Sequence, residues 1–339
     1  MRVVLAGYGN VGRSLHRMLE ERRRELLRSY SMDAIVVAVI DRGGAVVHWK
    51  GVPYAEAAAA KDSRGTVSRA EHHGRPGATV LDVLEEVEAD VYVDTTLPNF
   101  EDGQPSLSYI EKAMLRGMHV VTSNKAPLAL AMPALLEIAG YKGVRLLYSG
   151  TVGGGTPFLG LASGSLRGNR IRAVRGVLNG TTNYVLYRME REGASLEEAL
   201  EEARRLGYAE ADPTLDLSGM DAAAKLVILT NHATGSRYTL GDVRYSGIGR
   251  VTPGDLREAA RRGKALRLIA DSRGLRVGLE EVDAGSPLNV PANLNSVEFD
   301  VEELGSVYLI GRGAGGPETA AAVLRDLVQL NPLLPAGGH

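Results

Sequence analysis

The sequence contains no cysteine, which excludes disulfide bonds, thiolate catalysis and metal sites with cysteine ligands. No apolar run approaches the roughly 18 to 20 residues of a membrane span. The sequence enters an apolar strand at Arg2, so we expect no secretory leader. The formal net charge of −2 gives no basic footprint for nucleic acid. We therefore expect a cytoplasmic protein with neither a nucleic-acid nor a membrane partner.

The pattern of strands and helices changes near residue 148 and predicts two domains. The 339 residues are 44% hydrophobic and 24% charged, as in a soluble globular protein. Residues 1–148 alternate short apolar strands with helices, which is typical of an α/β Rossmann domain. Residues 149–305 predict a second, α+β domain with a mixed sheet. A last strand and helix, 306–332, are expected to return to the first domain.

A glycine-rich turn, G-Y-G-N-V-G, follows the strand at residues 2–6 and opens a helix predicted over 11–29. In a dinucleotide-binding turn the first glycine makes the tight turn, the second lets the backbone approach a pyrophosphate, and the third lets helix pack on strand. This context favours a cofactor over a turn without ligand. The predicted contacts, with the diphosphate at the helix N-terminus, come from Gly7, Gly9, Asn10, Val11 and Gly12.

Polar residues follow three further strands of the first domain. Asp41 favours NAD, because an acidic residue here accepts from the ribose 2′-hydroxyl, whereas Arg42 can pair with the 2′-phosphate of NADP. The other two strands, predicted within 91–96 and 119–125, lead to Thr95, Ser123 and Lys125. Ligands of open parallel sheets bind beyond the carboxyl ends of strands, so these three residues are expected at the nicotinamide.

The segment from Gly207 to Lys225 carries four carboxylates, at positions 210, 212, 216 and 221, and one lysine. A helix predicted over 219–234 places Asp221 and Lys225 one turn apart on one face. Such a pair is ordinary on a solvated helix. Two observations favour a buried, functional lysine. The helix continues with the apolar run 226–229, and lysine is scarce in this chain. Only seven of the 39 basic residues are lysine, at 50, 61, 112, 125, 142, 225 and 264. A lysine beside carboxylates can act as an acid, a base or an ion-pair partner.

The second domain contains further turn and cap signals. A glycine-rich loop, 149–157, exposes carbonyls that can bind a hard cation or can serve only as a hinge. A strand at 171–178 leads into N-G-T-T-N-Y, where Thr181 or Thr182 is expected to cap the next helix. Ser195 and Glu198 predict a capping box. The remaining strands are predicted at 267–271, 276–282, 297–301 and 307–310.

Taken together, these residues closely resemble homoserine dehydrogenases over nearly the whole chain. The resemblance lies in the glycine-rich start and in D-T-T-L-P-N-F-E-D-G-Q-P, H-V-V-T-S-N-K-A-P-L-A, S-G-T-V-G-G-G-T-P, G-V-L-N-G-T-T-N-Y, L-G-Y-A-E-A-D-P-T-L-D-L-S-G-M-D-A-A-A-K-L and G-R-G-A-G-G-P-E-T-A. We expect a monofunctional short form without an aspartokinase or a C-terminal regulatory domain. Phosphorylating aspartate-semialdehyde dehydrogenase is excluded, because it needs a cysteine nucleophile.

The resemblance implies reversible NAD(P)H-dependent reduction of L-aspartate 4-semialdehyde to L-homoserine by a homodimer, with catalysis and dimerisation in the second domain. It implies that Lys225 is the proton donor or acceptor and that Lys125 lies between nicotinamide and substrate. The expected substrate-binding residues are Gly180, Thr181, Gly207, Tyr208, Glu210, Asp216 and Asp221. Two alternatives stay open: another lysine-dependent amino-acid or sugar dehydrogenase, and a non-catalytic NAD(P)-binding regulator.

The resemblance also concerns the cofactor and a metal. Lys61 is expected in the adenosine pocket, where two cations against one carboxylate predict tighter binding of NADP(H) than of NAD(H); a solvent-facing Lys61 is the alternative. Gly315 is expected to contact the cofactor. A sodium site of main-chain carbonyls is implied at Ser149, Val152, Gly154 and Thr156, although the family often has glutamate where this chain has Ser149.

Overall fold

The computed structural model describes residues 1–210 and 212–333, which form two compact units. The first unit comprises Met1–Thr151 together with the C-terminal segment from Gly315, and the second comprises Val152–Ala314. The α/β class, with a Rossmann domain and an α+β domain, is confirmed. One boundary is corrected, because the last strand belongs to the sheet of the second unit and not to the first domain.

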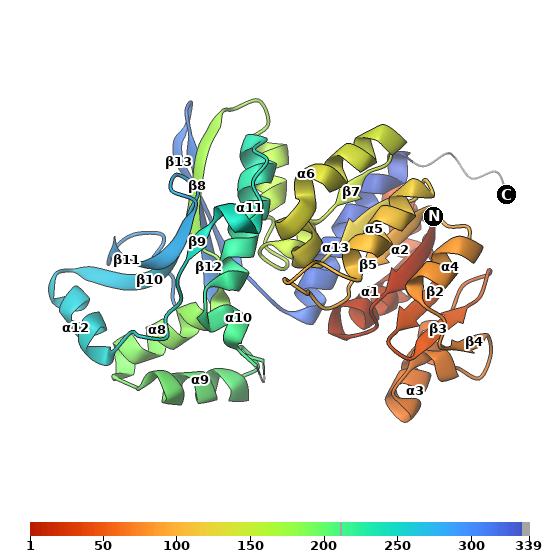
Figure 1. Cartoon of the computed structure of the whole chain (residues 1–339), viewed down its shortest axis with the longest axis horizontal. Coiled ribbons are helices and arrows are strands. Elements are labelled where there is room, and N and C mark those ends of the chain that lie inside the picture. The colour runs from red at the N-terminus through yellow and green to blue at the C-terminus, as the bar shows by residue number, and fades with distance from the viewer. Residues whose placement is uncertain (211, 334–339) are drawn as a thin grey trace. The chain divides into compact units, whose positions relative to one another are not determined.

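In the described part of the first unit, seven strands form one sheet in the order β4-β3-β2-β1-β5-β6-β7 (Figure 1). The strands β2-β1-β5-β6-β7 are parallel, whereas β3 and β4 are antiparallel additions at one edge. The strands are β1 (Arg2–Ala6), β2 (Ile35–Asp41), β3 (Gly44–Val47), β4 (Gly74–Pro76), β5 (Val91–Asp94), β6 (His119–Thr122) and β7 (Leu146–Leu147). The helices are α1 (Asn10–Glu21), α2 (Arg23–Tyr30), α3 (Tyr54–Arg64), α4 (Val80–Glu86), α5 (Ser106–Leu115), α6 (Lys125–Lys142) and α13 (Gly316–Leu330).

The core of the first unit forms on strands that are apolar along their whole length. Parallel strands covered on both faces have this composition, and β1 and β2 are buried at nearly every position. Helix α13 supplies Ala320, Val323, Leu327 and Leu330 to the same core, and it contacts α1. The helix predicted over 11–29 is divided at Arg22, where the backbone leaves helical geometry between α1 and α2.

In the second unit, the described residues contain a six-stranded mixed sheet in the order β13-β12-β8-β10-β11-β9. The strands are β8 (Ile171–Val177), β9 (Arg244–Tyr245), β10 (Lys264–Asp271), β11 (Arg276–Asp283), β12 (Leu294–Val301) and β13 (Gly305–Arg312). The helices are α7 (Phe158–Gly160), α8 (Gly180–Glu192), α9 (Leu196–Arg205), α10 (Thr214–Leu217), α11 (Met220–Thr234) and α12 (Pro253–Arg261). Short 3-10 or π turns lie at Val67–Arg69, Ser149–Thr151, Leu161–Ser165, Leu240–Asp242 and Asn331–Leu333.

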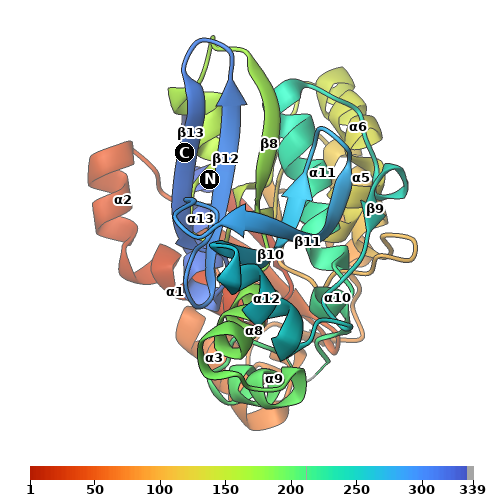
Figure 2. The same cartoon turned by 90° about the vertical axis from the view of Figure 1, so that its left-hand side faces the viewer.

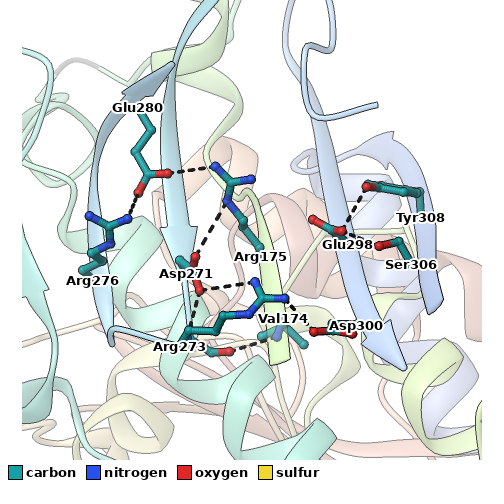
Figure 3. Close-up of polar contacts among 11 residues, drawn as sticks. Val174, Arg175, Asp271, Arg273, Arg276, Glu280, Glu298, Asp300, Ser306 and Tyr308 are labelled. Atoms are coloured by element: carbon teal, nitrogen blue, oxygen red, sulfur yellow. Dashed lines mark hydrogen bonds and ion pairs between the residues drawn. The ribbon is translucent and has the colours of Figure 1, made fainter. Parts of the chain in front are cut away.

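One face of this sheet contacts helix α11, whereas part of the other face carries a network of charged side chains. Figure 2 shows β13, β12 and β8 side by side, as their pairing requires. In Figure 3, Arg175 on β8 lies beside Glu280, 2.8 Å from its carboxylate, and Tyr308 donates to Glu298 over 3.0 Å. Because these groups are partly exposed and paired within the chain, each pair contributes little to stability.

Candidate active site

The glycine-rich turn has the backbone geometry that its sequence predicts. Gly7 has φ +88°, and a Cβ there would lie 2.5 Å from the carbonyl of Thr95. A Cβ on Gly12 would overlap the carbonyl oxygen of Gly7, whereas a Cβ on Gly9 would meet no atom within 4 Å. Gly9 is also the N-cap of α1, and it has no side chain to satisfy the first N–H groups of that helix. The turn therefore leaves space and donors for an anion at this helix N-terminus.

Two buried side chains that the sequence analysis did not single out, Tyr8 and His16, connect the turn to the rest of the unit. The hydroxyl of Tyr8 lies 3.0 Å from Nδ1 of His16, and Nε2 of His16 lies 2.9 Å from the carbonyl oxygen of Val52. Burial lowers the pKa of His16, so the ring is neutral near pH 7 and Nε2 carries the proton donated to Val52. Nδ1 then accepts from Tyr8. This chain of hydrogen bonds joins the glycine-rich turn to the segment before α3.

At the end of β2, Asp41 is occupied by contacts within the unit. Its side chain is only 6% exposed, and Nζ of Lys61 lies 2.8 Å from one carboxylate oxygen. Burial alone would raise the pKa of Asp41, but its hydrogen bonds lower it below the ordinary value. Arg42 is exposed and has no ion-pair partner among the residues described. The further donors to Asp41 are Gly43 N at 2.9 Å, Thr66 Oγ1 at 2.7 Å and Val67 N at 3.1 Å.

Thr95 and Ser123, which follow β5 and β6, connect the carboxyl ends of neighbouring strands. The hydroxyl of Thr95 lies 3.0 Å from the carbonyl oxygen of Ala6 and 2.6 Å from that of Gly7, so it fastens the glycine-rich turn. The backbone N–H of Ser123 donates to the carbonyl of Asp94 over 2.9 Å. Gly7, Thr95 and Ser123 therefore converge at the carboxyl ends of β1, β5 and β6.

A buried carboxyl group, Asp94, organises the next turn and was not among the predicted residues. It accepts from Ser106 Oγ and, over 2.6 Å, from Thr96 Oγ1. Burial raises the pKa of Asp94, although these hydrogen bonds oppose the rise. Thr96 in turn accepts from the side chain of Asn124 over 3.0 Å, and Asn124 caps α6, whose first residue is Lys125. The network therefore fixes the backbone that carries Lys125.

In the second unit, Lys225 is buried between a carboxylate and a carbonyl. Its Nζ lies 2.6 Å from Oδ2 of Asp221 and 2.9 Å from the carbonyl oxygen of Leu178. The side chains of Lys225 and Asp221 are 9% and 10% exposed. Helix α11 is buried from Asp221 to Asn231, which rules out the solvated helix face. An ammonium held this way can stabilise or protonate a developing oxyanion.

A second carboxyl group, Asp216, lies next to this ion pair. The side-chain amide of Asn179 donates to Asp216 over 2.6 Å and to Asp221 over 2.8 Å. Burial and then repulsion from Asp221 raise the pKa of Asp216, whereas the hydrogen bond from Asn179 and the charge of Lys225 oppose the rise. The segment around α10 therefore brings together the two carboxyl groups and the lysine that the sequence grouped.

The other predicted substrate-binding residues lie along the start of α8 and the segment before α10. Thr181 Oγ1 donates to the carbonyl of Tyr208 over 2.7 Å. The expected cap at Thr181 or Thr182 is wrong: Asn179 caps α8 by accepting from the N–H of Thr182 over 2.8 Å. Glu210 is exposed, and no described residue pairs with its side chain. Gly180 begins α8, and Gly207 adopts φ +74° in the turn after α9.

The four predicted cation ligands are divided between the units, with Ser149 in the first and the others in the second. Ser149 N–H donates to Asp326 over 2.8 Å, and burial raises the pKa of Asp326 to about 6. Gly154 has φ +53°, and Thr156 Oγ1 donates to the carbonyl of Arg312 over 2.9 Å. Within the described ranges, no group of three or more His, Asp or Glu side chains has a metal-binding arrangement. Val152 opens the second unit, and Gly315, with φ +137°, precedes α13.

The sequence of this chain is similar to that of known proteins over almost its whole length. The family model described as homoserine dehydrogenase matches residues 157–328. A homoserine dehydrogenase of Methanocaldococcus jannaschii is 40% identical over 332 residues, which cover 97% of this chain and 98% of that protein. The chain belongs to the homoserine dehydrogenase family. An NAD(+)-dependent homoserine dehydrogenase of Pseudomonas canavaninivorans is 35% identical and is covered to 96%.

Solved structures of homoserine dehydrogenases are similar to the structure of this chain. A hyperthermophilic archaeal homoserine dehydrogenase in complex with NADPH has a TM-score of 0.84 and 28% identity, and the match covers 98% of both chains. Homoserine dehydrogenases are NAD(P)-dependent oxidoreductases that act on a CH–OH group, so the predicted family and enzyme class are confirmed. None of the helices in the described part of the chain has the length and hydropathy needed to cross a membrane.

Proposed function

We propose that the protein catalyses the reversible NAD(P)H-dependent reduction of L-aspartate 4-semialdehyde to L-homoserine. The observation that carries the proposal is the buried Lys225, whose Nζ lies 2.6 Å from Asp221 and 2.9 Å from the carbonyl of Leu178. The bound nicotinamide supplies the hydride. Lys225 gives a proton to the aldehyde oxygen as charge develops there and takes it back from the alcohol in the reverse direction. Such proton transfer typically contributes about 10²- to 10⁴-fold in rate.

The carboxyl groups suit an amino-acid substrate. The exposed Glu210 is available for the substrate ammonium, and Asp216 and Asp221 add negative charge beside Lys225. The backbone of Gly180, Thr181, Gly207 and Tyr208 lines the remaining substrate pocket in this proposal. In this proposal Lys125, which begins α6, lies between nicotinamide and substrate.

For the cofactor, we propose tighter binding of NADP(H) than of NAD(H). Asp41 accepts from Lys61, from Thr66 and from two backbone N–H groups, so little acceptor capacity remains for a ribose 2′-hydroxyl. Arg42 is exposed, and the side chain of Lys61 is 29% exposed. Both cations are therefore available to a 2′-phosphate. A tightly held 2′-phosphate can also slow release, which would make NADP the slower coenzyme.

The diphosphate is assigned to the turn of Gly7, Gly9 and Gly12 and to the first N–H groups of α1, at Asn10 and Val11. Thr95 and Ser123 border the nicotinamide end in this proposal, and Gly315 adds a contact from the start of α13.

We also propose a sodium ion on the carbonyls of Ser149, Val152, Gly154 and Thr156. Neutral oxygen donors suit a hard monovalent cation better than a transition metal. The proposed assembly is a cytoplasmic homodimer.

A substrate panel tests the proposal against its alternatives. L-Homoserine, L-serine, L-threonine, other amino-acid alcohols and simple sugars would each be offered with NAD+ and NADP+. We expect kcat/KM for L-homoserine to exceed that of every other alcohol by at least about 10²-fold, because the site pairs with the substrate ammonium and hydroxyl. A preference for another alcohol would indicate a different dehydrogenase. Cofactor binding without turnover of any substrate would indicate a regulator.

A further inference from the structure

Asn179 joins three parts of the second unit that are far apart in the sequence. It ends the connection between β8 and α8, and its side-chain amide reaches Asp216 on α10 over 2.6 Å and Asp221 on α11 over 2.8 Å. Asn179 is only 3% exposed. A buried amide must satisfy both its donors and its acceptor to avoid a desolvation penalty. Its contacts are therefore structural requirements of this site.

The orientation of this amide is fixed by its other end. Oδ1 of Asn179 accepts from the backbone N–H of Thr182 over 2.8 Å and lies 3.0 Å from the hydroxyl of Thr182. Turning the amide over would place its oxygen against two carboxyl groups and its NH₂ against a helix N–H. The cap of α8 thus directs both donors of Asn179 toward Asp216 and Asp221.

The preceding residue of the same turn holds the lysine. The carbonyl of Leu178 accepts from Nζ of Lys225 over 2.9 Å, and Asp221 Oδ2 contacts both Lys225 Nζ and Asn179 Nδ2. Two consecutive residues therefore hold the site. The backbone carbonyl of Leu178 accepts from the ammonium, and the side-chain NH₂ of Asn179 donates to both carboxyl groups.

We infer that Asn179 is a positioning residue for the proposed reaction: its amide bridges Asp216 and Asp221 and thereby keeps Lys225 Nζ in its place. This inference rests on the proposed function and deepens it. Without the bridge, two like charges face each other in a buried site, and the charge of Lys225 has to offset their repulsion without the help of the amide.

The effect of the bridge on ionisation has a defined sign. Burial and repulsion from Asp221 raise the pKa of Asp216, and the hydrogen bond from Asn179, the charge of Lys225 on α11 and the hydroxyl of Thr181 on α8 oppose that rise. Removing the amide therefore raises the pKa of Asp216 further. A protonated Asp216 no longer attracts a substrate ammonium. As pH falls, a variant without the amide should therefore lose substrate binding at a higher pH than wild type does.

Two substitutions separate the bridge from the helix cap. Asn179→Ser keeps a side-chain oxygen that can cap α8, but a hydroxyl has one donor and cannot replace the NH₂ group. Ser195→Ala removes the capping box of α9, which does not contact the carboxyl groups, and serves as the control for cap loss. The profile of kcat/KM against pH would be measured for wild type and both variants.

We expect kcat/KM of Asn179→Ser to fall by about tenfold or more at pH 6, with a smaller loss at pH 8.5, so that the acidic limb moves to higher pH. Ser195→Ala should keep the wild-type profile. An unshifted limb in Asn179→Ser, or the same shift in Ser195→Ala, would overturn the inference.

Urea unfolding at pH 5 and pH 8 provides a test that does not need turnover. The pKa of Asp216 is raised in the folded state, so its contribution to stability is lost as pH rises from the unfolded value through the folded one. Asn179→Ser should therefore be more destabilised relative to wild type at pH 8 than at pH 5. Equal destabilisation at both pH values would overturn the role of the bridge. If wild type reduces no aldehyde while this difference is present, the proposed function fails and the bridge stands.

Discussion

Replacing Lys225 separates its two roles, as a buried positive charge and as a proton donor. Its Nζ lies 2.6 Å from Asp221, and both side chains are at most 10% exposed. Lys225→Met keeps the length of the side chain and removes the charge, which leaves Asp221 without its ion-pair partner beside Asp216. Breaking a buried ion pair by removing one partner typically costs about 3 to 5 kcal/mol. Lys225→Arg keeps the charge but cannot give up a proton at neutral pH.

Steady-state kinetics and urea unfolding distinguish these effects. Both variants should lose at least about 10²-fold in kcat, with the affinity for cofactor nearly unchanged, because the lysine acts on the substrate oxygen. Lys225→Met should also lose several kcal/mol of unfolding free energy, whereas Lys225→Arg should lose less. Lys264→Met is the matched control: its ion pair with Asp283 has a similar length, 2.6 Å, but is exposed, so its removal should cost at most about 1 kcal/mol and leave kcat unchanged. Near-native kcat in either Lys225 variant would refute the assignment.

Three further predictions concern substrate, cofactor and stability. Glu210→Gln should raise KM more than it lowers kcat; lost kcat at unchanged KM would move Glu210 into the proton-transfer path. In calorimetric titrations, Arg42→Ala combined with Lys61→Ala should weaken NADP binding by at least about tenfold and leave NAD binding nearly unchanged; equal affinities for both cofactors in wild type would contradict this. The pKa of Asp326 is raised to about 6, so the contribution of this carboxyl group to stability is lost as pH rises from about 4 through 6. Asp326→Asn should gain about 3 kcal/mol relative to wild type between pH 4 and pH 8, and a difference independent of pH in urea unfolding would argue against it.

Local sequence signals predicted several elements of this structure. The glycine-rich turn forms where it was predicted, because Gly7 adopts φ +88° and a Cβ on Gly12 would overlap the carbonyl oxygen of Gly7. Ser195 and Glu198 form the expected capping box. The helix predicted over 219–234 corresponds to α11, Met220–Thr234, with Gly219 as its N-cap. In each case neighbouring residues carry the physical cause, so a short segment contains enough information.

The remaining features depend on residues far away in the sequence. In N-G-T-T, Asn179, Thr181 and Thr182 are all good caps, and the choice of Asn179 is tied to carboxyl groups 37 and 42 residues away. The strand at 305–312 forms a hairpin with β12, and it joins the second sheet because β12 pairs with β8, far earlier in the sequence. No local pattern encodes the carboxyl partners of Asn179 or the pairing of β12 with β8.

The contacts of Asp41 also come from distant residues. Asp41 and Arg42 alone indicated opposite cofactors, and the hydrogen bonds that Lys61 and Thr66, 20 and 25 residues later, donate to Asp41 support the proposed preference for NADP(H). The contact between Tyr8 and His16 escaped prediction since a buried histidine carries no sequence signal.

The central claim is that this chain reduces L-aspartate 4-semialdehyde, and its direct test is the semialdehyde-dependent oxidation of NADPH and NADH measured side by side on the purified protein. The product would be identified by chromatography against L-homoserine. The account predicts saturable oxidation with L-homoserine as product, and a loss of at least about 10²-fold in kcat in Lys225→Met. Cofactor oxidation that does not depend on the semialdehyde, or no oxidation by a folded protein that binds the cofactor, would contradict it.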